Sequence, residues 1–251
     1  MNFHTFGDEN KPVILLIHGV LTPWQVWETQ TEHFSKSYRV VVVALDAHEE
    51  ERASEFLSIQ DEAEKIENYV LEELGGSVFA ICGISMGAAI TNLIWQNGII
   101  GAEKFVLDGA PLIPCGGLPK WIMRNNYITI IKKSKQRDPK VLESFKKQFL
   151  PERFLDSYLK IADHMNEGSI RNIINSVFAG SLCTSLDDDG SRLLFMHGTK
   201  GNELLAAKSA KKMLKSYPKM TEKCFNGYAH CEAAIYKQEE WLATVEDFLK
   251  R

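Results

Sequence analysis

Gly83, Ser85 and Gly87 form a G-x-S-x-G pattern that could present a serine hydroxyl for nucleophilic attack. Residues 78–82 before it are apolar and β-prone, and residues 88–95 after it are apolar at helical spacing. A strand, a tight glycine-bounded turn and a helix, in this order, are the context of a nucleophile elbow. The N-terminus of such a helix favours negative charge at the serine oxygen. The pattern therefore predicts that Ser85 is a nucleophile, and not merely a helix cap.

The elements that must position Ser85 alternate between buried strands and helices. Apolar runs that are typical of parallel strands covered on both faces occur at 13–17, 38–45, 78–82, 104–107 and 192–197, with short strands expected at 2–7 and 223–225. Helices are predicted at 25–35, 58–74, 204–217 and 235–249, in addition to the helix that follows Ser85. The sequence therefore predicts an α/β fold with a mostly parallel central sheet flanked by helices.

Residues 112–189 break this alternation, because they carry apolar residues in helical patches and no strand pattern. We expect them to form a helical cap that is inserted before the penultimate strand, over the carboxyl edge of the sheet. The core then consists of residues 1–111 and 190–251. Four residues are candidates for the wall of a pocket under the cap: Trp24, Trp121, Met123 and Phe149.

Bulk properties are those of an ordinary globular protein. The chain of 251 residues has a net charge of −4, which gives no reason to expect nucleic acid or an anionic membrane as a partner. The start of the chain has no signal-peptide pattern, and the five cysteines show no C-x-x-C spacing, so free thiols in a cytoplasmic protein are expected. No spacing typical of metal ligands occurs. The charged run at residues 48–52 is interpreted as a solvated loop without a functional role.

Four features follow one another along the chain: His18-Gly19 after an early strand, the pattern around Ser85, the helical insertion, and His230 before the last helix. In this order they resemble the α/β-hydrolase superfamily, and specifically its small esterases with a helical cap. The resemblance implies that Ser85 is the nucleophile and His230 the base that takes its proton. It also implies an oxyanion hole formed by the backbone N–H groups of Val20 and Met86. His18 would belong to the same loop as Val20 and is expected to be structural.

The acid of the expected triad departs from the family pattern. Family members usually carry it a few residues after the strand that ends near residue 198, but glycine stands at position 201, where aspartate is expected. Asp108, directly after the strand that follows the elbow strand, is the favoured alternative. Glu203 could reach back from the usual loop, or Asn202 could orient the imidazole without a charge.

Together these residues predict a serine hydrolase that cleaves a small carboxylic ester or thioester through a covalent acyl-serine intermediate, without a metal or organic cofactor. One alternative is a C–C bond hydrolase or lyase on the same scaffold, since a fold does not fix a function. Another alternative is a catalytically silent binding protein of the same fold, which the glycine at position 201 would explain.

Overall fold

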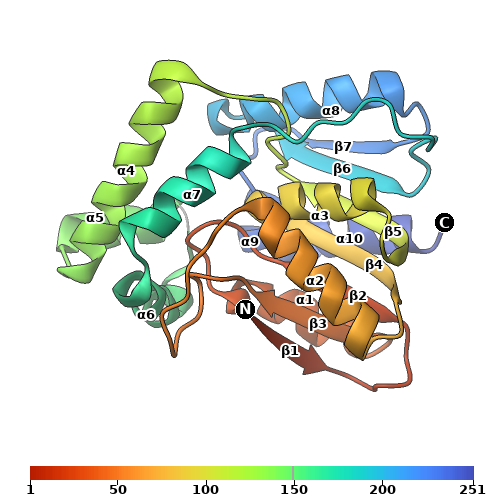
Figure 1. Ribbon diagram of the computed structural model, residues 1–251, viewed down its shortest axis with the longest axis horizontal. Helices are drawn as coiled ribbons and strands as arrows, with labels where there is room; N and C mark the ends of the chain where they lie inside the picture. The colour runs from red at the N-terminus through yellow and green to blue at the C-terminus, as the bar shows by residue number, and fades with distance from the viewer. Residues whose placement is uncertain (149) are drawn as a thin grey trace.

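The computed structural model describes residues 1–148 and 150–251. In these residues one seven-stranded sheet has the order β1-β3-β2-β4-β5-β6-β7 (Figure 1). Strand β1 pairs with β3 in antiparallel orientation, and all other neighbours are parallel. The strands are β1 (Asn2–Phe6), β2 (Val13–Ile17), β3 (Arg39–Ala44), β4 (Ser77–Ile84), β5 (Gly101–Asp108), β6 (Leu193–Gly198) and β7 (Thr221–Phe225). The predicted fold class, a mostly parallel sheet in an α/β protein, is confirmed.

Helices cover both faces of the sheet, with α2 and α3 in front of it and α1 and α10 behind it in Figure 1. Behind the sheet, Trp241 of α10 packs against Trp27, directly before α1, with ring centroids 5.3 Å apart. The α-helices are α1 (Glu28–Phe34), α2 (Ile59–Glu73), α3 (Met86–Asn97), α4 (Gly117–Lys135), α5 (Pro139–Gln148), α6 (Leu155–His164), α7 (Glu167–Val177), α8 (Leu204–Ser216), α9 (Glu232–Tyr236) and α10 (Gln238–Leu249).

The central strands are apolar because both of their faces are covered. Residues 14–17 of β2 and 40–43 of β3 have no exposed surface. Their carboxyl ends are aligned in register, since Ile17 lies opposite Gly83 and Ile84 lies opposite Asp108. The loops that follow β2, β4, β5 and β6 therefore meet at one edge of the sheet, where parallel sheets place ligand chemistry.

Helices α4 to α7 lie between β5 and β6 and pack mainly on one another. The Ser134 hydroxyl of α4 is 2.8 Å from that of Tyr158 in α6, inside this helical segment. The segment is anchored to the loop before α2, because the Ser169 hydroxyl accepts the N–H of Phe56 at 3.2 Å. Its interpretation as a cap over a separate core stays a prediction.

Two helices differ from the sequence-based expectation. The one predicted at 25–35 begins as the 3₁₀ turn η1 (Trp24–Trp27), and the closing helix is divided into α9 and α10 at Lys237. Among the helices of the described residues, none combines the length and the apolar character that crossing a membrane requires.

The interpretation of residues 48–52 as a solvated loop is wrong for its first part. His48 and Glu49 are 0% and 2% exposed, respectively. Glu49 is paired with Arg52 across three residues, and His48 is hydrogen-bonded to backbone groups on both sides of its ring. Hydrogen-bond and ion-pair partners of this kind make burial of polar side chains possible.

Candidate active site

Ser85 lies in the sharp turn between β4 and α3. Its φ of 52° and ψ of −113° are strained for a residue with a side chain. A Cβ atom on Gly83 would lie 2.3 Å from the carbonyl oxygen of Gly87, and one on Gly87 would lie 2.2 Å from that of Ile17. Only glycine fits at these two positions, which explains the G-x-S-x-G pattern and confirms the predicted elbow geometry.

His230 reaches Ser85 from the loop between β7 and α9. Its Nε2 lies 2.8 Å from the Ser85 Oγ, within hydrogen-bond distance. Gly109 makes room for the ring, because a Cβ on this glycine would lie 2.9 Å from the His230 Cε1. The His230 side chain keeps 33% of its surface accessible. It is therefore open to a small molecule on one side, although protein surrounds it on the others.

Glu203 holds the other side of the His230 ring. One carboxylate oxygen is hydrogen-bonded to the His230 Nδ1, and the other accepts the N–H of Gly198 at 2.8 Å. The side chain is 1% exposed and comes from the short 3₁₀ turn after β6. The Asn202 side chain contacts the backbone of the same histidine and not its ring: the Asn202 Oδ1 accepts the backbone N–H of His230 at 3.2 Å.

Asp108, the favoured acid of the sequence-based prediction, does not hydrogen-bond to His230. Its Oδ2 accepts the indole N–H of Trp241 at 3.1 Å, on the side of the sheet that α10 covers. Both ring nitrogens of His230 are already engaged by Ser85 and Glu203. The expected Asp108–His230 contact is thus corrected to Glu203–His230, since the longer side chain after β6 reaches the ring.

Charge around His230 favours its protonated form. Burial lowers the pKa of His230, but the hydrogen bond and charge of Glu203, together with the charge of Asp108, outweigh it and raise the pKa above the ordinary value of 6.5. The pKa of Asp108 is itself raised to about 7, first by burial and then by the negative charge of Glu203. An imidazolium formed here would be stabilised by a carboxylate at hydrogen-bond distance.

The two predicted oxyanion donors belong to segments next to Ser85. Met86 is the first residue of α3, so its N–H has no acceptor within the helix. A Cβ on Gly19 would lie 3.3 Å from the Ser85 Cβ, which brings the loop after β2 next to the serine. Among the described residues, no protein group accepts the N–H of Val20. Both N–H groups thus belong to segments next to Ser85, and their role as an oxyanion hole stays a prediction.

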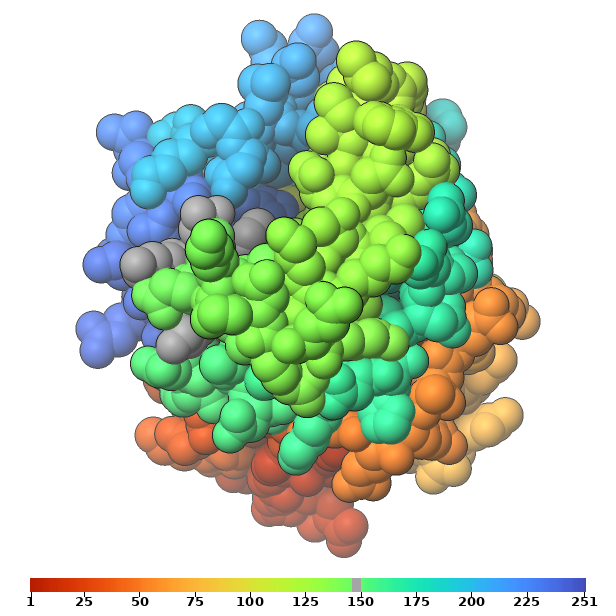
Figure 2. Space-filling view, turned by 90° about the vertical axis from the view of Figure 1, so that its left-hand side faces the viewer, coloured from red at the N-terminus to blue at the C-terminus, as the bar shows by residue number. Residues whose placement is uncertain are grey.

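The predicted pocket-wall residues have different surroundings. Trp24 is half-buried and stacks on His4, with ring centroids 4.1 Å apart. Trp121 is 55% exposed, Met123 is half-buried, and Phe149 lies outside the described residues. The space-filling view shows a recess in the surface between α4, in yellow-green, and α8, in light blue (Figure 2).

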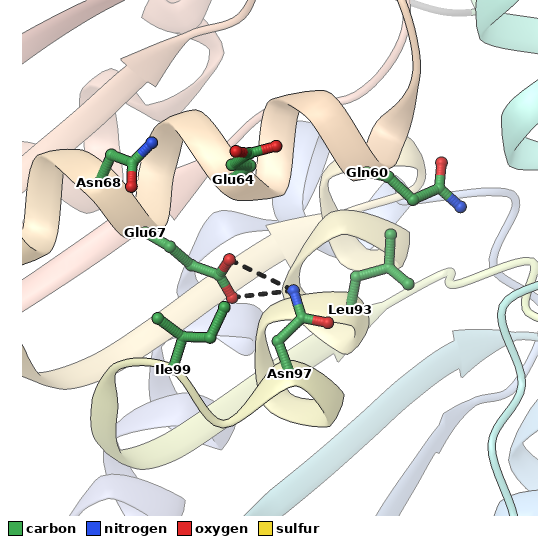
Figure 3. Close-up of a pocket in the computed structure, with 7 residues that line it drawn as sticks. All are labelled: Gln60, Glu64, Glu67, Asn68, Leu93, Asn97 and Ile99. Atoms are coloured by element: carbon green, nitrogen blue, oxygen red, sulfur yellow. Dashed lines mark hydrogen bonds between the residues drawn. The ribbon is translucent and has the colours of Figure 1, made fainter.

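Two other features lie outside the site around Ser85. One is a cavity between α2 and α3, and the other is a group of three carboxylates, those of Asp46, Asp61 and Glu62. The cavity has a volume of about 360 Å³ and is lined by Glu67 and Asn97, whose side chains are hydrogen-bonded to each other (Figure 3). The carboxylates of Asp46 and Asp61 could hold a metal ion with Glu62, but the Lys65 ammonium lies 2.5 Å and 2.6 Å from the first two. The Lys65 ammonium therefore balances the negative charge of these two carboxylates, as a metal ion would.

Comparison with solved structures identifies the fold. An α/β-hydrolase family protein from Desulfitobacterium hafniense superposes with a TM-score of 0.73 at 18% identity, over 99% of this chain and 100% of that one. A carboxylesterase from Nitrososphaera gargenis superposes with a TM-score of 0.76 at 14% identity, over 99% of this chain and 93% of that one. This chain has the α/β-hydrolase fold.

Sequence comparison adds one weak similarity. No family model matches the chain. Epoxide hydrolase 1 of Caenorhabditis elegans is 24% identical over 127 residues, which are 51% of this chain and only 25% of that protein.

Two sequence-based expectations about the site differ from the structure. The sequence favoured Asp108 as the partner of His230, and it did not predict the burial of His48. The loop after β6 was the signal for Glu203, and no local signal marked His48.

Proposed function

We propose that this chain is a serine hydrolase of small carboxylic esters or thioesters. The observation that carries the proposal is the line of hydrogen bonds from the Ser85 Oγ through the His230 ring to the Glu203 carboxylate. This arrangement gives a hydroxyl, a base within reach of its proton, and a carboxylate that orients the base.

In the proposed reaction, the Ser85 Oγ attacks the acyl carbon while the His230 Nε2 takes its proton. The carbonyl electron pair moves to oxygen, and the N–H groups of Val20 and Met86 hold the resulting oxyanion. The carbonyl then re-forms, the bond to the leaving alcohol or thiol breaks, and His230 protonates that group. Water, deprotonated by His230, releases the carboxylic acid from Ser85 in the same way.

Glu203 keeps the His230 Nδ1 protonated and stabilises the imidazolium, so that Nε2 is the nitrogen that faces Ser85. It supplies the acid whose absence at Gly201 motivated the binding-protein alternative. Helices α4 to α7 are proposed as the cap that encloses the substrate. The similarity to a carboxylesterase supports the choice of an ester substrate.

Turnover of p-nitrophenyl acetate and butyrate, and of a short acyl thioester, tests the proposal. We expect hydrolysis by the wild-type protein and a loss of at least about 10³-fold in Ser85→Ala. Hydrolysis that persists in Ser85→Ala would contradict the proposed nucleophile. A folded wild-type protein that cleaves none of these substrates would favour the C–C bond chemistry of the alternative reading.

A further inference from the structure

Two buried histidines tie together the loops that follow β2 and β3. His18, on the first loop, accepts the N–H of Leu45 on the second at 3.1 Å, through its Nε2. His48, on the second loop, accepts the N–H of Leu21 on the first at 3.0 Å, also through its Nε2. The two ring centroids lie 5.0 Å apart, and neither side chain has any exposed surface. Each loop therefore carries a ring that binds the backbone of the other.

The remaining ring nitrogens fix both histidines in one neutral form. The His18 Nδ1 donates to the carbonyl oxygen of Gly19 at 2.8 Å, and the His48 Nδ1 donates to that of Asp46 at 3.0 Å. Each ring thus uses one donor and one acceptor, as a neutral imidazole can. Burial lowers the pKa of His18 to about 3 and that of His48 to about 4, so both rings stay neutral near pH 7.

The braced loop contains one of the proposed oxyanion donors. The carbonyl of Gly19 and the N–H of Val20 belong to one planar trans peptide, so they point in opposite directions. The Gly19 oxygen is held by the His18 ring and by the Thr22 hydroxyl at 2.9 Å. Fixing this oxygen also fixes the direction of the Val20 N–H.

The next peptide is held by His48. Leu21 has a φ of 57°, a left-handed conformation that is unfavourable for a residue other than glycine and that needs support from its surroundings. The hydrogen bond from the Leu21 N–H to His48 provides this support directly after Val20. Without it, relaxation of Leu21 would rotate the Val20–Leu21 peptide, which directly follows the peptide that carries the oxyanion donor.

We propose that His48 is a positioning residue, which holds the loop after β2 so that the Val20 N–H points at the oxyanion. This inference rests on the proposed function, because it concerns the transition state of that reaction. It gives a role to a side chain that stands before three glutamates in the sequence and that contacts no reacting atom.

Two substitutions separate the two hydrogen bonds of the His48 ring. In His48→Gln, the longer amide can offer an oxygen near the position of Nε2 and so accept the Leu21 N–H. In His48→Asn, the shorter amide can replace only the Nδ1 donor to Asp46. Thr22→Val gives an independent variant, because it removes the second hydrogen bond to the Gly19 oxygen while keeping the side-chain shape.

Asn97→Ala is the control for loss of a side-chain hydrogen bond away from Ser85. It removes the hydrogen bonds to Glu67 at the far end of α3, about 16 Å along the helix from Met86. We expect this variant to unfold at a lower temperature and to keep wild-type kcat.

The readouts are kcat and KM for p-nitrophenyl butyrate, and the inhibition constant of a trifluoromethyl ketone, which forms an oxyanion on addition of the serine. We expect His48→Asn to lower kcat about 10- to 100-fold with KM little changed, and to weaken the inhibitor by a similar factor. Thr22→Val should show the same split with a smaller effect. His48→Gln should remain within a few-fold of wild type.

Wild-type kcat and inhibition in both His48→Asn and Thr22→Val would overturn the positioning role while leaving the proposed function intact. If His48→Asn does not fold, Thr22→Val alone decides between these outcomes. A wild-type protein that neither turns over the ester nor binds the ketone would overturn the proposed function, and the positioning role with it.

Discussion

Glu203→Gln should nearly abolish activity, whereas Asp108→Asn should leave it close to wild type. The Glu203 carboxylate is hydrogen-bonded to the His230 Nδ1 and is 1% exposed, so little solvent screens its charge. A glutamine amide can donate to the His230 Nδ1, which leaves the ring proton on Nε2. A protonated Nε2 cannot accept the Ser85 proton. Loss of both the charge and the correct tautomer is expected to cost about 10²- to 10⁴-fold in kcat/KM, or about 3–5 kcal/mol.

Asp108→Asn keeps the contact that this residue makes, because the asparagine oxygen can still accept the Trp241 N–H. Its effect should appear in stability instead. A carboxyl whose pKa is raised in the folded state binds a proton more tightly there, so its contribution to stability falls as the pH rises from about 4 to about 7. The difference from the ordinary value of 3.8 corresponds to on the order of 4 kcal/mol. Asp108→Asn should remove this loss and raise the melting temperature at pH 8.

The assay is hydrolysis of p-nitrophenyl butyrate by both variants at pH 8, with thermal unfolding of each at pH 5 and pH 8. Both substitutions remove one buried carboxylate charge and keep the side-chain shape, so each is the control for the other. An Asp108→Asn variant that is folded but inactive, beside an active Glu203→Gln variant, would refute the assignment of Glu203 and restore the acid that sequence alone favoured.

Three further predictions follow from the same contacts. The acid limb of the pH profile of kcat/KM should lie above pH 6.5, because His230 must be neutral to act as a base and its pKa is raised. In Glu203→Gln this limb should move to lower pH, and an unmoved limb would contradict the Glu203–His230 contact. Gly109→Ala should lower kcat at least about 10-fold, since the new methyl group displaces the His230 ring; unchanged turnover would show that the ring can move aside. Since the pKa of His48 is lowered to about 4, the free energy of unfolding should decrease as the pH falls from about 6.5 to about 4, and this residue should contribute on the order of 3 kcal/mol to the decrease. Urea unfolding of His48→Gln should therefore show a weaker pH dependence than that of the wild-type protein.

The sheet and the elbow could be predicted from sequence because their signals are local. Apolar runs fix the strands, and the steric demand for Gly83 and Gly87 acts within a few residues of Ser85. The N-terminus of α2 was marked in the same way, since the Ser58 hydroxyl accepts the N–H of Asp61 at 3.0 Å. The interruption at Lys237 was not predicted, because the apolar pattern continues across it.

The acid and the buried histidine could not be settled from sequence, because their partners are distant along the chain. Asp108 ends β5 and Glu203 follows β6, and these strands end at the same edge of the sheet, so only the directions of the two side chains separate them. His48 stands before three glutamates, which suggested solvent, yet its partner Leu21 lies 27 residues earlier. Contacts between loops of this kind depend on the assembled sheet and not on a local pattern.

The measurement that tests the central claim most directly is reaction of the native protein with a fluorophosphonate, followed by mass-spectrometric location of the adduct. The account predicts rapid modification of Ser85, which is slowed in His230→Ala and in Glu203→Gln but not in Asp108→Asn. Absence of an adduct at Ser85 in protein that is shown to be folded would contradict the proposed serine hydrolase.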